Sequence, residues 1–207
     1  MIKRKSNLNL ILFVIFYFII DFVINFIFIK ILGGYDNRIN YDLSVIYSRL
    51  FIFGIFILLI IINKNIFEYL KFRPISIKKI LLFLGASIFY SFLIIFIRNK
   101  NFNDYNFHWL QYHNYFLLSA IFIAPFYEEI FKKGLPIEYL LRKKISPIFV
   151  TIFISFLFCL THLPSLEQVF YGLILGIITS LIYIKERNII YPIIFHFVYN
   201  FIILCIS

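Results

Sequence analysis

Two adjacent carboxylates, Glu128 and Glu129, stand inside a long apolar stretch of this chain. A buried glutamate can serve as a general base in hydrolysis, because loss of solvent disfavours its charged form and raises its pKa towards neutrality. Adjacent residues of a helix point about 100° apart, so these two carboxylates cannot both aim at one substrate atom. We therefore expect Glu128 and Glu129 to have different roles.

Each glutamate has a lysine four residues further along, Lys132 for Glu128 and Lys133 for Glu129. Residues four apart share one face of a helix, and glutamate before lysine is the better order for an ion pair. The spacing therefore predicts both pairs. Taken alone, the two pairs also fit a structural ladder of charges at a helix end.

Two histidines also lie in apolar stretches, and each has a partner four residues away on the same helical face. Phe158 precedes His162, and Asn200 follows His196. An imidazole N–H and a neutral amide can both donate to the negative charge that develops on a carbonyl oxygen during hydrolysis. The alternative for each motif is a hydrogen bond between helices, which contributes about 1 kcal/mol in membranes.

The stretches that carry these residues have the composition of membrane-spanning helices. Of the 207 residues, 62% are hydrophobic and 14% are charged. Roughly 20 apolar residues cross a hydrocarbon core about 30 Å thick, and such runs recur along the chain. We predict an all-α transmembrane bundle, 1–207 forming a single membrane domain, with about seven spanning helices at 8–29, 46–62, 79–97, 115–140, 147–163, 166–184 and 189–206.

The formal net charge of +10 comes from lysines and arginines in short segments between the apolar runs. Such clusters set membrane topology and do not form the basic face of a nucleic-acid-binding protein. If the N-terminus is cytoplasmic, that side receives the basic clusters at 3–5, 64–79, 132–144 and 185–187. The opposite side receives only Lys30, Arg38, Arg98 and Lys100. We therefore expect a cytoplasmic N-terminus.

Other polar or small residues have structural interpretations. Asp21, in the first predicted span, is expected to pair with Arg49. Gly172 and Gly176 form a small-xxx-small pair that lets a neighbouring helix approach closely.

Two further groups of residues could suggest metal or redox chemistry. Cys159 and Cys205 lie within apolar runs, so we expect packing residues instead of a disulfide or a thiolate site. The polar segment 98–114 contains His108, Trp109 and His113, for which an interfacial aromatic belt is favoured over a metal site or a lid.

A single site formed by both histidine motifs requires their helices to converge. Along its helix His196 lies roughly 14 Å from Arg187, whereas His162 lies roughly 27 Å from Lys144. Tilted or broken helices must supply the difference, and four prolines lie near the motifs: Pro125, Pro136, Pro164 and Pro192.

In combination, these motifs resemble those of the CPBP intramembrane proteases, also called the CAAX-protease, bacteriocin-processing or abortive-infection family. The first family motif is Glu-Glu-x-x-x-Arg, which matches Glu128 and Glu129, with Lys133 in place of the arginine. The second, Phe-x-x-x-His, matches Phe158 and His162. The third, His-x-x-x-Asn, matches His196 and Asn200, so the resemblance defines a protease-like core at about 115–205.

The resemblance implies an endopeptidase that acts on a peptide bond near the cytoplasmic half of the bilayer. Glu128 and His162 would activate a water for attack on the scissile carbonyl. His196 and Asn200 would stabilise the oxyanion, and Glu129 would hold the geometry with the basic residue four positions later.

The resemblance also bears on cofactors and partners. The family has been described both as zinc-dependent and as metal-independent glutamate proteases; with zinc, the ligands would be Glu128, His162 and His196. No H-E-x-x-H helix is present to favour zinc. The expected partners are membrane lipids and a peptide or protein substrate, prenylated or bacteriocin-like, with no nucleic acid. The expected location is a bacterial cell membrane.

Two other function classes stay open. Lys133 favours a non-catalytic immunity or scaffold protein of the same fold, because a lysine cannot grip a carboxylate with the planar fork of an arginine. Buried carboxylates and histidines also occur in small proton-coupled transporters. Inverted repeats would favour a transporter, and the sequence shows none.

Overall fold

The computed structural model describes residues 2–34, 37–62, 70–98, 114–163 and 165–206 of the chain. Within these residues it contains seven continuous helical segments and no strand, which confirms the predicted all-α membrane bundle. The segments are α1 (Ile2–Ile31), α2 (Arg38–Ile62), α3 (Ile77–Arg98), a composite helix over 114–142, α7 (Pro147–Leu160), α8 (Leu166–Glu186) and α9 (Ile190–Ile206).

Among the helices that the structure describes, four are long and apolar enough to cross a membrane: α1, α2, α3 and α8. The helices α7 and α9 are also apolar but shorter, with 14 and 17 residues. Large apolar side chains such as Phe22, Leu58 and Phe89 point outwards, as expected of surfaces that contact lipid. The chain is an integral membrane protein.

The composite helix alternates between two helical forms. It consists of α4 (Asn114–Leu117), η4 (Leu118–Ile123), α5 (Ala124–Tyr127), η5 (Glu128–Gly134) and α6 (Leu135–Arg142), in which the η segments are π-helical. Pro125 and Pro136 each lie at the start of the α-helical segment that follows a π segment. A proline has no N–H, and its ring clashes with the carbonyl four residues earlier in an α-helix, so a wider turn accommodates it.

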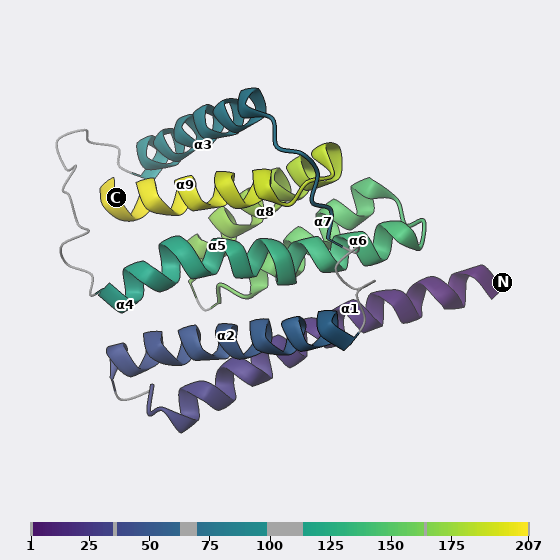
Figure 1. Ribbon diagram of the computed structural model, residues 1–207, viewed down its shortest axis with the longest axis horizontal. Coiled ribbons are helices and arrows are strands. Elements are labelled where there is room, and N and C mark those ends of the chain that lie inside the picture. Colours follow the sequence, from purple (N-terminus) through teal and green to yellow (C-terminus); the bar gives the residue numbers. More distant parts are fainter. Residues whose placement is uncertain (1, 35–36, 63–69, 99–113, 164, 207) are drawn as a thin grey trace.

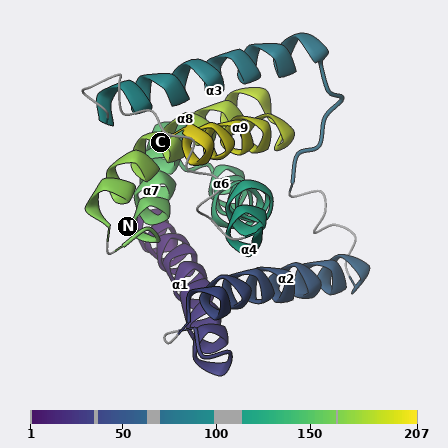
Figure 2. The ribbon, with the colours of Figure 1, turned by 90° about the vertical axis from the view of Figure 1, so that its left-hand side faces the viewer.

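The helices lie side by side in the bundle (Figure 1), with the N-terminus at one end and the C-terminus at the other. Figure 2 shows α3 next to α9, and the α1–α2 hairpin on the other side of the composite helix. The helices α7 and α8 pack against each other, and both contact η5. The composite helix therefore touches both α2 and the C-terminal helices.

The two glycines that the sequence singled out lie where α8 closely approaches α7 and the turn that follows α7. A Cβ atom at Gly176 would lie 3.3 Å from the Ser155 Cα atom. A Cβ atom at Gly172 would lie 3.2 Å from Nδ1 of His162. The small-xxx-small prediction is confirmed, because larger side chains at these positions would push the helices apart.

In the described part of the chain, buried apolar side chains form two clusters. One joins α1, the composite helix and α7, and includes Phe18, Phe131 and Ile154. The other joins α3, α8 and α9, and includes Tyr90 and Phe195. The two clusters together hold the helices that carry the polar motifs.

Candidate active site

Both glutamates of the first motif lie on η5 and are buried, with 6% of Glu128 and 1% of Glu129 exposed. Lys133 forms an ion pair with Glu129, and Nζ of Lys132 lies 3.8 Å from Oε1 of Glu128. The two pairs predicted from the four-residue spacing are therefore present. Such partners are needed because an isolated charge is strongly disfavoured in a low-dielectric interior.

His196 contacts both glutamates through opposite nitrogens of its ring. Its Nδ1 lies 2.7 Å from Oε1 of Glu129, and its Nε2 lies 3.9 Å from Oε2 of Glu128. The histidine is itself buried. The adjacent carboxylates thus approach one imidazole from two directions, so they occupy different positions in the site.

Lys133 lies deep in the bundle beside Glu129. Its Nζ donates to Oγ1 of Thr179 at 2.7 Å and lies 4.2 Å from the centroid of the Phe158 ring. A lysine in the arginine position of the motif therefore still supplies a buried cation to Glu129. The contact with an aromatic face adds a favourable cation–π interaction.

His162 lies in the turn between α7 and α8, because α7 ends at Leu160, earlier than the predicted end at 163. Its Nδ1 lies 3.2 Å from the Phe158 carbonyl oxygen, and its ring meets the Phe158 ring edge-to-face at 4.9 Å. The Phe158 ring also meets the His196 ring edge-to-face, at 6.3 Å. One aromatic side chain therefore contacts the histidines of both motifs.

Asn200 links α9 to η4. Its Nδ2 donates to the Ala120 carbonyl oxygen at 2.8 Å. An asparagine amide carries two N–H donors, so one can hold the neighbouring helix while the other serves a substrate.

Arg49 contacts Glu128 and not Asp21, which corrects the pairing expected from the sequence. Its Nη2 lies 3.3 Å from Oε1 of Glu128. Asp21 instead accepts a hydrogen bond from the Tyr127 hydroxyl and lies 3.8 Å from Nζ of Lys132. The reason is the position of the composite helix, which presents an acidic partner to Arg49 and a basic partner to Asp21.

Two cations, Arg49 and Lys132, therefore lie beside the Glu128 carboxylate. Burial alone led to the prediction of a base with near-neutral pKa, whereas the structure places two cations beside this carboxylate. A general base must be ionised to accept a proton, and opposite charges favour the ionised form of a carboxylate. The signal for Arg49 was present in the sequence, since an ionisable residue inside a span marks a functional site.

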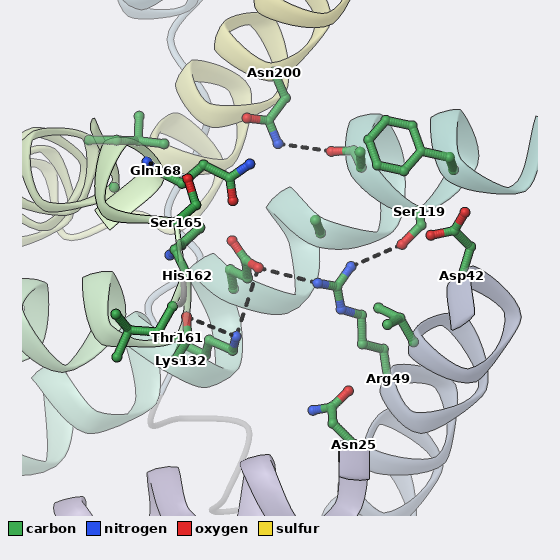
Figure 3. A pocket seen from close by; sticks show the side chains of 18 of the residues that line it. Asn25, Asp42, Arg49, Ser119, Lys132, Thr161, His162, Ser165, Gln168 and Asn200 are labelled. Carbon is green, nitrogen blue, oxygen red and sulfur yellow. Dashed lines mark hydrogen bonds and ion pairs between the residues drawn. The ribbon is translucent and has the colours of Figure 1, made fainter. Parts of the chain in front are cut away.

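These side chains surround one cavity of about 800 Å³, which is lined by both polar and apolar residues. Four candidate site residues line it: Glu128, His162, His196 and Asn200. Figure 3 shows Arg49, Ser119 and Lys132 around the same space. Glu129 and Lys133 are not among the described lining residues and act on the site through the contact between Glu129 and His196.

Uncharged polar residues complete the contacts around the cavity. Arg49 donates to Oγ of Ser119 at 3.2 Å, and Lys132 donates to Oγ1 of Thr161 at 3.3 Å. Sequence reasoning missed both hydroxyls, because serine and threonine are common in spanning helices and only packing selects those that meet a charge.

The described side chains are not arranged as a metal site in this structure. In the part of the chain that the structure describes, no group of three or more His, Cys, Asp or Glu side chains could hold a metal ion. Glu128, His162 and His196 are therefore not grouped as ligands of one metal ion in this structure, and the zinc site considered from the sequence stays a prediction. Cys159 is buried and Cys205 half-buried, and both are free thiols.

Two features named from the sequence lie outside the described residues. They are the polar segment 98–114, except its first and last residues, and Pro164.

Comparison with protein families identifies the C-terminal part of the chain. A family model described as type II CAAX prenyl endopeptidase Rce1-like matches residues 110–202. This match confirms the resemblance to CAAX-type proteases that the motifs of the segment indicated. The chain matches no curated protein and no solved structure.

The Rce1-like family is one of CAAX-type intramembrane proteases. Its matched segment contains all three motifs and their helices, from the composite helix to α9. Asp21 and Arg49 lie outside the match, on α1 and α2. The site described above therefore combines the Rce1-like segment with the N-terminal hairpin.

Proposed function

We propose that this chain is an active intramembrane endopeptidase in which Glu128 is the general base. The observation that supports this proposal is that Glu128, His162, His196 and Asn200 line one cavity. These residues come from η5, the α7–α8 turn and α9, which sequence spacing alone does not bring together. The match of residues 110–202 to a family of proteases is consistent with that arrangement.

The first step is the attack of a water on the scissile carbonyl carbon. Glu128, assisted by His162, takes a proton from the water as its oxygen forms a bond to carbon. The electron pair of the carbonyl double bond moves to the carbonyl oxygen. Arg49 and Lys132 keep partner charges next to the base while it is ionised.

The second step is collapse of the tetrahedral intermediate. Asn200 and His196 donate to the oxyanion, where preformed donors are most effective. Glu129 accepts from Nδ1 of His196 and orients the ring; with both nitrogens protonated, Nε2–H can face the oxyanion. The C–N bond then breaks, and the leaving amine takes the proton held by Glu128, which restores the resting enzyme.

The contacts of Lys133 support catalysis over the non-catalytic immunity or scaffold alternative. That alternative rested on the loss of an arginine. Lys133 keeps an ion pair with Glu129, and Glu129 keeps its hydrogen bond to His196. The contacts that position His196 through Glu129 are therefore all present.

The substrate class is proposed from the family. We propose that the substrate is a prenylated or bacteriocin-like peptide or protein that reaches the cavity from the membrane. We also propose that the enzyme lies in a bacterial cell membrane. The cavity volume of about 800 Å³ is sufficient for a short peptide segment.

The test is cleavage by the full chain purified into lipid vesicles. Quenched fluorescent peptides with and without a C-terminal prenylcysteine serve as substrates. We expect Glu128→Gln to reduce cleavage on the order of 100-fold or more, because it removes the base without changing side-chain volume. Glu186→Gln is the matched control, since Glu186 pairs with Lys79 away from the cavity.

Equal cleavage by wild type and Glu128→Gln would remove Glu128 from catalysis. Absence of cleavage by well-folded wild type on both peptide classes would favour the non-catalytic alternative.

A further inference from the structure

The cavity extends to one end of the bundle. Exposed residues line it there, among them Arg38, Glu167 and Gln168, so it reaches the surface at this end. Most of the other lining residues lie in the helix halves nearest the same end, including Asn25 on α1, Ser119 on η4 and Leu204 on α9. Lys132 and His196 lie slightly beyond the middle of their helices, at the inner end of the cavity. This end contains the end of α1, the start of α2, the start of α4, the α7–α8 turn and the end of α9.

The basic clusters lie together at the other end. The backbone N–H of Ile189 donates to the Lys71 carbonyl at 3.0 Å, and Asn188 donates to the Arg73 carbonyl at 2.9 Å. Arg187 pairs with Glu138 at 2.8 Å, which joins the α8–α9 turn to α6. Three clusters separated in the sequence, at 71–79, 142–144 and 185–187, therefore meet at one end. None of their residues lines the cavity.

The two ends can be followed in Figure 1, where the N-terminus and the α6–α7 turn lie at one end of the bundle. The C-terminus and the start of α4 lie at the other end. In membrane proteins the loops rich in lysine and arginine stay in the cytoplasm. This rule counts basic residues, so the pairing of Arg187 with Glu138 does not cancel it.

We propose that the cavity opens towards the non-cytoplasmic face of the membrane and takes its substrate from that face. An N-terminus in the cytoplasm and hydrolysis near the cytoplasmic half, both expected from the sequence, are incompatible in this fold. The reason is that the mouth of the cavity and the basic clusters lie at opposite ends. The charge pattern decides between the two expectations.

The substrate part of this inference rests on the proposed function. A peptide that reaches Glu128 from the non-cytoplasmic face is an exported peptide or a segment of a membrane protein outside the cytoplasm. The C-terminus of a cytoplasmic protein does not meet this requirement.

Two serines provide a matched test of the orientation. Ser165 precedes α8 and lines the cavity, whereas Ser146 precedes α7 at the basic end. Each is replaced by cysteine in a Cys159→Ala/Cys205→Ala background of the full chain. Intact bacterial cells that express each variant are treated with a membrane-impermeant maleimide, before and after permeabilisation.

We expect Ser165→Cys to be labelled in intact cells and Ser146→Cys only after permeabilisation. The reverse pattern, or equal labelling of both variants in intact cells, would overturn the proposal. If Ser165→Cys does not react even after permeabilisation, Gln168→Cys, at an exposed lining position, replaces it. Adding Glu128→Gln should leave the labelling unchanged, so a failure of proteolysis and a failure of the orientation give different results.

Discussion

The Arg49 guanidinium lies 3.3 Å from the Glu128 carboxylate, although 79 positions separate the two residues in the chain. Glu128 lies within the Rce1-like match at 110–202, and Arg49 lies on α2, before it. Arg49 also lies 5.6 Å from the centroid of the Tyr127 ring. The N-terminal hairpin is therefore part of the site and not only a membrane anchor.

Arg49 is expected to be a positioning residue for the base. Arg49→Leu should lower kcat/KM on the order of 100-fold, because Glu128 loses the partner that fixes its carboxylate. Arg49→Lys should retain most of the activity, since it keeps the positive charge. Peptide cleavage in lipid vesicles measures both variants. A leucine variant that unfolds more easily but cleaves at the wild-type rate while folded would assign Arg49 a purely structural role.

The ion pair between Lys133 and Glu129 gives a second prediction. Lys133→Leu leaves a buried carboxylate without its cation, which should reduce the free energy of unfolding by about 3–5 kcal/mol. Lys133→Arg should preserve or raise cleavage, because a guanidinium can pair with Glu129 through two parallel hydrogen bonds. Thermal unfolding in detergent and peptide cleavage test the pair of variants. Similar behaviour of the arginine and leucine variants would argue against a role for this ion pair.

Gly172 gives a third prediction, because a Cβ atom there would lie 3.2 Å from Nδ1 of His162. Gly172→Ala should shift the imidazole slightly and lower kcat on the order of 10-fold, because even small misplacements of catalytic groups slow the reaction. Gly85→Ala is the matched control, since a Cβ atom at Gly85 meets nothing within 4 Å. That control should cleave normally and unfold at the same or a higher temperature, because alanine favours helix over glycine. Equal kcat for both alanine variants would show that His162 is not required in its present position.

Asn200 gives a fourth prediction. Asn200→Ala should lower kcat on the order of 100-fold or more with little change in KM, the pattern expected when a donor to the oxyanion is lost. The substitution also removes the hydrogen bond to Ala120. Ser87→Ala controls for that loss, because Ser87 donates to the Phe195 carbonyl on α9 at 2.6 Å. An equal fall in kcat for both variants would show that Asn200 only holds two helices together and does not donate to the oxyanion.

The sequence by itself determined the helices and the contacts within them. Apolar runs predicted seven helical segments, and the four-residue spacing predicted the pairs of Glu128 with Lys132 and of Glu129 with Lys133. These features are local, because helix geometry places residues four apart on one face whatever surrounds the helix. The prolines marked irregular positions in the composite helix, but not that the adjacent turns would be π-helical.

Only the tertiary structure decided which charges from different helices meet. It placed Arg49 beside Glu128, Asp21 beside Lys132 and His196 between the two glutamates. These contacts depend on how deep each residue lies in the bundle and on which helices are neighbours. The separation of two residues along the chain does not determine their depth in the bundle or which helices are neighbours. The packing of the helices determines both, because a buried charge contacts the opposite charge that packing brings nearest to it.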